Sequence, residues 1–213
     1  DPRRTGAYIT IKRNAERILN LINQMMDLRK IDKGMMKMRM RETDFIGFVE
    51  DICHMFEYQS RAKSIKLSFV HEDQHLPVWI DLANFDKVVV NLLSNAFKYT
   101  ATGGEIVVTV SHDNKNMVLS VRDNGEGIPK DKVEKIFERF YHSDTKTNDR
   151  HLGTGIGLDL ANSLVLLHHG SITAKNNEKG GGATFTVTIP LGSAHLRDEE
   201  KVEISENDSN EDT

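Results

Sequence analysis

The stretch DNGEGI, residues 123–128, directly follows an alternating segment from Met117 to Arg122 and precedes Pro129. The alternation predicts a β-strand, and the two glycines after it let a planar ligand approach the backbone closely. The carboxylate of Asp123 accepts hydrogen bonds without donating any, which suits the exocyclic amine of such a ligand. Taken alone, however, the stretch is better explained as an ordinary turn before a helix that starts at the proline.

A second polar stretch, NLLSNAFKY at residues 91–99, lies on a predicted helix over 83–99. The core face of that helix carries Phe85, Val88, Val89, Leu92 and Ala96. Asn91, Asn95 and Lys98 are spaced i, i+4 and i+7, so they share one face beside the apolar one. An amide oxygen suits Mg²⁺ and an ammonium suits a phosphate. A solvated face that carries two asparagines by chance explains this stretch about equally well.

Two further stretches follow along the chain. FERFY, residues 137–141, is an aromatic cluster for which core packing is the default explanation. GTGIGL, residues 153–158, is a glycine-rich loop that enters a predicted helix over 156–168. Free N–H groups at a helix N-terminus favour phosphate binding. The loop is neither a dinucleotide fingerprint, which needs a parallel βαβ unit, nor a P-loop, which needs Gly-Lys-Ser/Thr.

The remaining periodicities predict an α+β fold, because helices and antiparallel-type strands occur without strict βαβ alternation. Strands are expected over residues 36–41, 65–70, 78–80, 105–110, 117–122, 171–175 and 183–189, with a short helix from Pro129 to about residue 140. A helix over about 45–62 has Asp44 as its predicted N-cap. Its expected inward residues are Phe45, Phe48, Val49, Ile52, Met55 and Phe56.

The first predicted helix covers residues 7–33. Its apolar seam consists of Ile11, Ala15, Ile18, Ile22 and Met25, which recur at spacings of four and three. Such a seam packs against other helices in a bundle. One helix cannot bury it alone, so partner helices are expected to be missing or to come from a second chain.

The composition is that of an ordinary globular protein of 213 residues, with 38% hydrophobic and 28% charged residues. The net charge of −4 gives no reason to expect direct nucleic-acid binding. No apolar run approaches the roughly 20 residues that span a bilayer. The single cysteine, Cys53, is expected to be an inert core thiol in a reducing, cytoplasmic compartment. The segment 198–213 carries eight acidic residues and is expected to be a disordered linker.

Two histidine pairs need a separate interpretation. His71-Glu-Asp-Gln-His75 fits the H-E-x-x-H zinc pattern, but Pro77 and the flanking strands exclude the helix that this chemistry requires, so a surface loop is expected. His168 and His169 end the helix over 156–168, where cations are favoured.

The four polar stretches, in this order and spacing, resemble the N box (91–99), G1 box (123–128), F box (137–140) and G2 box (153–158) of sensor histidine kinases. The resemblance runs from about residue 7 to 196 and implies a two-layer α/β sandwich of the histidine kinase, gyrase and chaperone ATPase type. Residues 182–192, followed by His195-Leu196, resemble hybrid two-component sensors of Bacteroides-type bacteria.

The resemblance also implies residue roles in binding ATP and Mg²⁺. Asp123 would accept from the adenine amine, with Gly125, Gly127 and Ile128 shaping the base pocket and Thr184 helping through water. Asn95 would ligate Mg²⁺, Asn91 and Lys98 would hold the phosphates, and Tyr99 would line the nucleotide; Asn95 and Lys98 are the implied catalytic residues. Residues 141–154, from Tyr141, would form a mobile lid. The segment that closes on the phosphates would be Gly153, Thr154, Gly155, Ile156, Gly157 and Leu158. Many family members have arginine where this chain has His142, so Arg139 or Lys146 would have to supply the cation.

The implied activity is transfer of the γ-phosphoryl group of ATP to a histidine that lies upstream of this chain. Residues 1–33 would be the second helix of a dimerisation hairpin, 34–196 the catalytic domain and 197–213 a linker to a receiver domain downstream. The intact protein would be a homodimer and the cytoplasmic portion of an inner-membrane sensor. The fragment alone would not autophosphorylate. A gyrase- or chaperone-like ATPase clamp and a non-enzymatic nucleotide-sensing module remain as alternatives.

Overall fold

The computed structural model of the chain describes residues 2–139 and 155–202. Its centre is a five-stranded sheet in the order β2-β4-β5-β7-β6. The strands are β2 (Lys66–His71), β4 (Glu105–His112), β5 (Asn116–Asp123), β7 (Ala183–Pro190) and β6 (Ser171–Asn176). β2 and β4 pair in parallel, and the other neighbours are antiparallel. A separate ladder joins β1 (Arg41–Asp44) to β3 (Pro77–Ile80).

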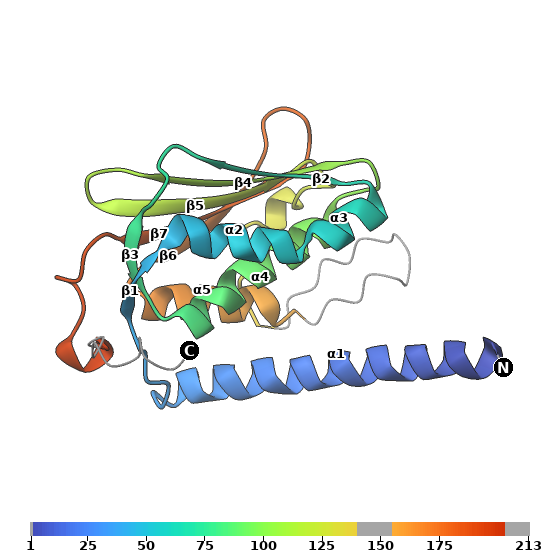
Figure 1. Ribbon diagram of the computed structural model, residues 1–213, viewed down its shortest axis with the longest axis horizontal. Helices are drawn as coiled ribbons and strands as arrows, with labels where there is room; N and C mark the ends of the chain where they lie inside the picture. The colour runs from blue at the N-terminus through green and yellow to red at the C-terminus, as the bar shows by residue number, and fades with distance from the viewer. Residues whose placement is uncertain (1, 140–154, 203–213) are drawn as a thin grey trace, which may run out of the picture.

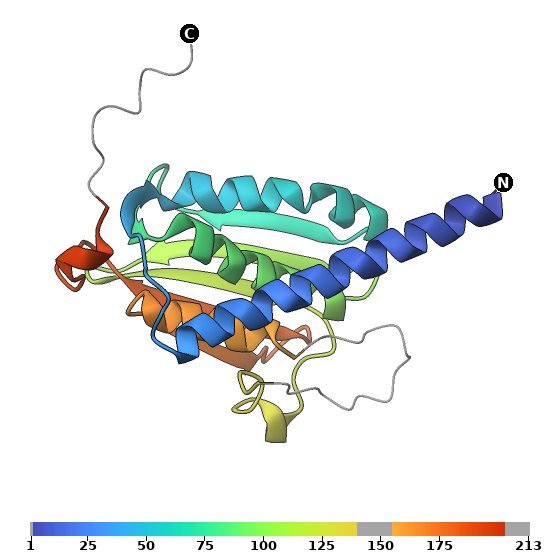
Figure 2. The same cartoon turned by 90° about the horizontal axis from the view of Figure 1, so that it is seen from below.

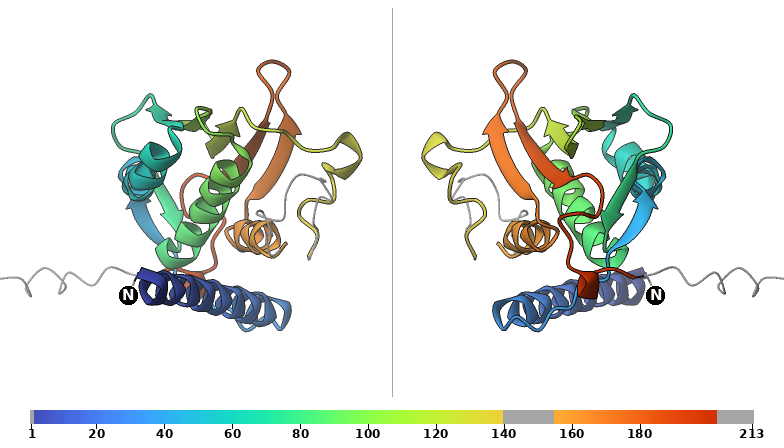
Figure 3. Two further views of the ribbon diagram at one scale, coloured as in Figure 1. Left: turned by 90° about the vertical axis from the view of Figure 1, so that its right-hand side faces the viewer. Right: turned by 90° about the vertical axis from the view of Figure 1, so that its left-hand side faces the viewer.

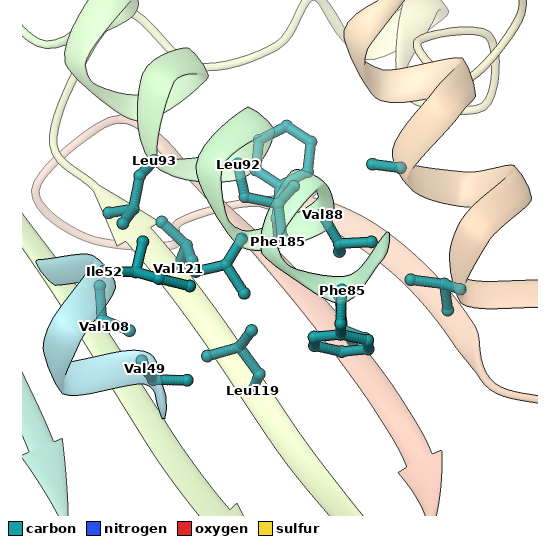
Figure 4. Packing of buried hydrophobic residues seen from close by; sticks show 14 of the residues in the cluster. Val49, Ile52, Phe85, Val88, Leu92, Leu93, Val108, Leu119, Val121 and Phe185 are labelled. Atoms are coloured by element: carbon teal, nitrogen blue, oxygen red, sulfur yellow. The ribbon is translucent and has the colours of Figure 1, made fainter. Parts of the chain in front are cut away.

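One face of the sheet is covered by α2 (Phe45–Met55), α4 (Leu82–Tyr99) and α5 (Gly157–Leu167), as Figure 1 and the end-on views of Figure 3 show. The core lies between these two layers. Figure 4 shows side chains of α2 and α4, among them Ile52 and Leu92, pointing toward Leu119 and Phe185 of the sheet. All five residues of the predicted core face of α4 are buried. The predicted α+β sandwich is therefore confirmed.

The predicted helix over 45–62 is two helices. Asp44 caps α2 as expected, and its carboxylate accepts from the backbone N–H of Ile46 at 3.3 Å. α2 ends at Met55, Phe56 is its C-cap, and α3 (Glu57–Lys63) begins at the next residue. The expectation that Met55 points inward is wrong, because the side chain is 62% exposed.

The first helix, α1 (Pro2–Asp32), runs beneath the helical layer, and its N-terminal part projects beyond the sandwich (Figures 1 and 2). Helix begins at Pro2, earlier than expected, which the missing N–H of proline permits in a first turn. The predicted seam is uncovered: Ile11, Ile18 and Met25 are each at least half exposed. In the part of the chain that the structure describes, no helix is long and apolar enough to cross a bilayer.

The C-terminal part of α1 docks on the sandwich. Leu28 is buried in the main core. Gln24 Nε2 donates to Asn91 Oδ1 at 3.3 Å, and Lys87 Nζ donates to Asp27 Oδ2 at 2.7 Å. These contacts connect α1 to the helix that carries the N box.

Residues 35–40 connect α1 to β1. As predicted from the alternating pattern, Met38 and Met40 are buried. Most of the segment, however, does not form the predicted strand. Met40 forms an isolated parallel bridge with Lys201. Its N–H donates to Glu200 O at 2.6 Å, and its carbonyl accepts from Val202 N at 2.8 Å.

The partner of this connection is residues 196–202, which we call the strap. Leu196 packs with Met38 and Met40, and the 3-10 turn η2 (Asp198–Glu200) follows. The Glu200 side chain is only 7% exposed. The prediction that the disordered linker begins at residue 197 is therefore wrong for 197–202, because this segment pairs with the α1–β1 connection. Residues 203–213 lie outside the described part.

Three smaller expectations meet different outcomes. The helix expected from Pro129 to 140 is a single 3-10 turn, η1 (Lys130–Lys132), followed by turns up to the last residue described before the gap. Cys53 is buried, and burial raises the pKa of its thiol to about 11, as expected for an inert thiol. His75 pairs with Asp44 at 2.8 Å, and the described residues contain no cluster of metal-binding side chains.

Candidate functional site

A pocket opens between the C-terminal half of α4 and the end of β5. It encloses about 590 Å³ of empty space, counting its open mouth, a size typical of small-molecule sites. Its lining consists of Asn95, Tyr99, Asp123, Gly127, Ile128, Pro129, Lys132, Ile136, Leu158, Ala183 and Phe185. Residues from three of the predicted stretches, N box, G1 box and G2 box, thus meet in one cavity.

Asp123 is the buried charge of this pocket, with 5% of the residue exposed. One carboxylate oxygen, Oδ1, accepts from Gly125 N at 2.9 Å and Ala183 N at 3.4 Å. Burial raises the pKa of Asp123, against the lowering effect of these two hydrogen bonds. Within residues 2–139 and 155–202, Oδ2 has no hydrogen-bond partner. An acceptor therefore remains available at the pocket wall.

Two glycines let the backbone close tightly around Asp123. A Cβ on Gly125 would lie 2.3 Å from the carbonyl oxygen of Tyr99, at the end of α4. A Cβ on Gly182 would lie 2.1 Å from the carbonyl oxygen of Asp123, and its φ of +78° also favours glycine. The G1 segment is thus pressed between the N-box helix and β7.

The N-box residues divide into two groups. Asn95 and Tyr99 line the pocket, and Lys98 Nζ donates to the Tyr99 hydroxyl at 3.1 Å. Asn91 lies one turn earlier, where it accepts from Gln24 of α1. A Cβ on Gly157 would lie 2.9 Å from Asn91 Oδ1, so the first residue of α5 is close to this amide.

The G2 residues that the structure describes begin at Gly155, whose φ is +65°. Leu158 lines the pocket, whereas the Ile156 side chain is 2% exposed and belongs to the hydrophobic core. Only the backbone of Ile156 is therefore placed to meet a ligand. The predicted site residues Tyr141, Gly153 and Thr154, the lid over 141–154, and the positions His142 and Lys146 lie outside the described residues.

Thr184 does not belong to the pocket. Ala183 and Phe185 of β7 face the core, and strand alternation turns Thr184 to the opposite side of the sheet. Its hydroxyl donates to Asn177 Oδ1 at 2.6 Å. The expected contribution of the Thr184 side chain to base binding is therefore wrong, and Ala183, with its N–H to Asp123, occupies that place.

Five lining residues were not predicted: Pro129, Lys132, Ile136, Ala183 and Phe185. The first three follow the G1 box directly, so their closeness to it in sequence was a usable signal. Phe185 is opposite Val121 in the β5–β7 register, which no local pattern reveals. Phe137 of the F box packs edge-on against Phe185, with ring centroids 6.3 Å apart, and so supports the pocket from behind.

Arg139 was a candidate for the missing lid cation, but two carboxylates hold its guanidinium. Its Nη1 and Nη2 donate to Asp32 of α1 at 2.9 and 3.1 Å. Its Nε donates to Asp159 of α5 at 2.8 Å. In this arrangement Arg139 links α1 to the G2 helix.

The profile of histidine kinase-, DNA gyrase B- and HSP90-like ATPases matches residues 80–193, which contain the whole pocket. The chain belongs to this ATPase family. It is 33% identical over 196 residues to "Histidine kinase P4" of Formosa agariphila, covering 90% of this chain and 14% of that protein. It is 35% identical over 185 residues to "Sensor histidine kinase TmoS" of Ectopseudomonas mendocina, covering 86% and 19%.

Among solved structures, the nucleotide-free catalytic domain of histidine kinase ThkA superposes with a TM-score of 0.65 at 27% identity, covering 72% of this chain and 99% of that one. Within the ATPase family, the chain therefore has the fold of a histidine kinase catalytic domain, preceded by a helix. The match spans less than a fifth of the length of each of these two curated relatives.

Proposed function

We propose that the chain is the ATP-binding catalytic region of a two-component sensor histidine kinase and supplies the phosphoryl donor. The observation that carries this proposal is the pocket itself. It brings Asp123, Asn95 and Tyr99, from two separate predicted stretches, to one cavity in a domain of the ATPase family.

The residues present fit an adenine nucleotide. The Oδ2 atom of Asp123 offers the acceptor that an adenine amine needs, and Ile128, Ile136 and Phe185 offer apolar walls. The Asn95 amide offers an oxygen of the kind that Mg²⁺ accepts in addition to water and phosphate oxygens. Bound Mg²⁺ would neutralise phosphate charge during phosphoryl transfer. Lys98 and Tyr99 lie beside Asn95 on the same helix, and Asn91 lies one turn before it.

The acceptor histidine is proposed to lie upstream, on a helix that forms a hairpin with α1. The exposed seam of α1 supports this, since apolar residues on one long helix need partner helices. Residues 1–33 would then belong to a dimerisation domain, and a homodimer would bury the seam. We extend the proposed catalytic domain to residue 202, because the strap packs on it.

The wider setting is proposed from the resemblance. A receiver domain would follow the acidic residues after the strap, as in the hybrid sensors of Bacteroides-type bacteria that residues 182–196 resemble. The membrane would be reached only through the part upstream, and the catalytic region would lie in the cytoplasm. A response regulator and the neighbouring dimerisation domain would be the protein partners.

Calorimetry with ADP and Mg²⁺ tests the assignment directly. We expect the unmodified chain to bind and both Asp123→Asn and Asn95→Ala to weaken binding by tenfold or more, about the effect of losing one hydrogen bond to a charged group. Asp51→Asn, an exposed change on α2, is the matched control and should leave binding unaltered. Absence of binding to the folded, unmodified chain would refute the proposal.

A gyrase- or chaperone-like clamp is the second candidate, because the same family includes such ATPases. Steady ATP hydrolysis by this chain without any acceptor would favour it. Phosphorylation on histidine of a longer chain that includes the upstream hairpin would favour the kinase, and failure of that longer chain to be phosphorylated would favour a nucleotide-sensing module.

A further inference from the structure

Asn176, the last residue of β6, holds the end of the G1 segment. Its Nδ2 donates to the carbonyl of Ile128 at 2.6 Å, and its Oδ1 accepts from the N–H of the same residue at 2.7 Å. One side-chain amide thus faces both backbone groups of one residue, as a peptide group of a neighbouring strand would. Ile128, which lines the pocket, is fixed as though β6 continued past its end.

The next residue, Asn177, holds the beginning of the same segment. Its Nδ2 donates to the carbonyl of Asp123 at 2.7 Å and to Gly181 O at 2.7 Å. The amide is itself oriented by Thr184, whose hydroxyl donates to Asn177 Oδ1 at 2.6 Å. Asn177 N also donates to Gly182 O at 3.0 Å, which closes the turn between β6 and β7.

The segment between these two contacts has little else to define its shape. Gly125 and Gly127 contribute no side chain, and Glu126 is exposed. Asn124 is tied to Glu105 of β4 by two hydrogen bonds, at 3.2 and 2.8 Å, on the other side of β5. Glycines allow many backbone conformations, so contacts at the ends of a glycine-rich segment largely decide its conformation. The closeness of Gly127 to Asn176, whose Oδ1 would lie 2.9 Å from a Cβ, shows how tightly the amide fits.

We infer that Asn176 and Asn177 are positioning residues for base recognition in this pocket. They hold the two ends of the G1 segment so that the Asp123 carboxylate and the Ile128 side chain face the same cavity. The inference rests on the proposed nucleotide site. A positioning role also explains why asparagine occupies both positions. Asparagine provides a donor and an acceptor in one short planar group, whereas aspartate has no donor when ionised.

The experiment compares two nucleotides, ADP and inosine diphosphate, in calorimetry with Mg²⁺. Inosine diphosphate lacks the amine that Asp123 would accept, and so it reports on the rest of the site. For Asn176→Asp and Asn177→Ala we expect ADP affinity to fall about tenfold, the effect of one lost hydrogen bond. Inosine diphosphate, which would still contact Ile128, should lose less affinity than ADP does, so the preference for ADP falls.

Two controls separate positioning from stability. Asn114→Asp makes the same chemical change in the β4–β5 turn, at the far end of the sheet, and should preserve the preference. Thr184→Val keeps the shape of the side chain but removes the hydroxyl that orients Asn177, and should reduce the preference by about threefold. All measurements are made well below the thermal unfolding midpoint of each variant. If Asn177→Ala folds poorly, the milder Thr184→Val variant still tests the inference.

Retention of the ADP preference by the folded variants would overturn the inference while leaving the proposed function intact. Equal weakening of both nucleotides would also overturn it, because the asparagines would then support the fold rather than base selection. Absence of ADP binding to the unmodified chain would overturn both the inference and the proposed function.

Discussion

At the residue scale, Asp123 combines burial with a carboxylate oxygen that faces the pocket. Burial raises its pKa, while the N–H groups of Gly125 and Ala183 counteract that effect through Oδ1. A carboxyl group that titrates above its ordinary range loses its acceptor character at a higher pH than an exposed one. For the proposed nucleotide site, this property predicts that binding depends on pH.

We expect ADP affinity to be constant above the pKa of Asp123 and to fall as the pH drops through it, because protonation removes the ionised acceptor. The raised pKa places this fall above pH 3.8, the ordinary value for aspartate. Calorimetry over pH 4 to 7 measures it. The same titration of Asp123→Asn reports the ligand's own protonation, and identical pH profiles for the two proteins would contradict the prediction.

Gly125 provides a second residue-scale prediction. Gly125→Ala would place a methyl group 2.3 Å from the Tyr99 carbonyl, so the G1 segment or the end of α4 has to shift. We expect ADP binding to weaken by at least about tenfold and stability to fall by about 1–3 kcal/mol, as for other overpacked sites. Gly47→Ala, in α2 and 3.2 Å from a carboxylate oxygen of Asp44, lies away from the pocket; it is the control and should leave ADP binding unchanged.

Single residues also show why part of the site escaped sequence reasoning. Asp123 and Asn95 were predicted from local patterns and Tyr99 from the family resemblance, and all three line the pocket. Thr184 was assigned to the pocket instead of Ala183, because a shift of one residue in a strand reverses the face and no local signal fixes the register here.

The sequence also misled the interpretation of His168, which was expected to be a cation at a helix end. The side chain is 1% exposed, and burial lowers its pKa, which favours the neutral imidazole over the expected cation. It accepts from Asp81 N at 3.1 Å and donates through Nδ1 to Leu164 O at 2.7 Å. Tertiary burial, which periodicity at a helix end does not show, decided its charge.

At the element scale, α1 is held by its last two turns while its apolar seam stays exposed. Asp27, Asp32 and Gln24 contact α4 and Arg139, so the docking adds polar contacts that are sensitive to ionic strength to the buried Leu28 side chain. Sequence periodicity predicted the helix and its seam. It did not predict the docking, which depends on side chains 60 or more residues away along the chain.

We expect Asp27→Asn to loosen this docking, because Lys87 loses a partner at 2.7 Å whose side chain is 16% exposed. The loss should be about 1 kcal/mol or less, so amide exchange in the last turns of α1 should accelerate by about fivefold at most. Hydrogen exchange measured by mass spectrometry reports this. Glu16→Gln, whose partner Lys12 lies within α1, is the matched control, and equal exchange in both variants would contradict the prediction.

At the scale of the whole molecule, the strap fastens the C-terminal side of the sandwich to the α1–β1 connection. Although burial alone would raise the pKa of Glu200, hydrogen bonds from Arg197 and His169 hold it at about 2. A depressed pKa means that the ionised group stabilises the strap above its ordinary value of 4.5. That stabilisation is lost as the pH falls from 4.5 to about 2.

We expect Glu200→Gln to release the strap at neutral pH, with a loss of up to about 3 kcal/mol. Trp79, the single tryptophan, packs against the Leu196 cluster and reports strap release by a red shift of its emission. Exposed Glu199→Gln is the control. Unchanged Trp79 emission in Glu200→Gln at pH 7, with far-ultraviolet circular dichroism showing an intact fold, would contradict the prediction.

The pairing of Met40 with Lys201 means that the chain enters and leaves the sandwich at the same place. The helix before this place and any segment after it are therefore joined to the sandwich side by side, and α1 is held there in addition by Leu28 and Asp27. Because its two ends are adjacent, the sandwich also suits insertion into a loop of another protein. Spliced into a host loop whose ends lie about 5 Å apart, roughly one strand spacing, it would leave the host's own chain path undisturbed.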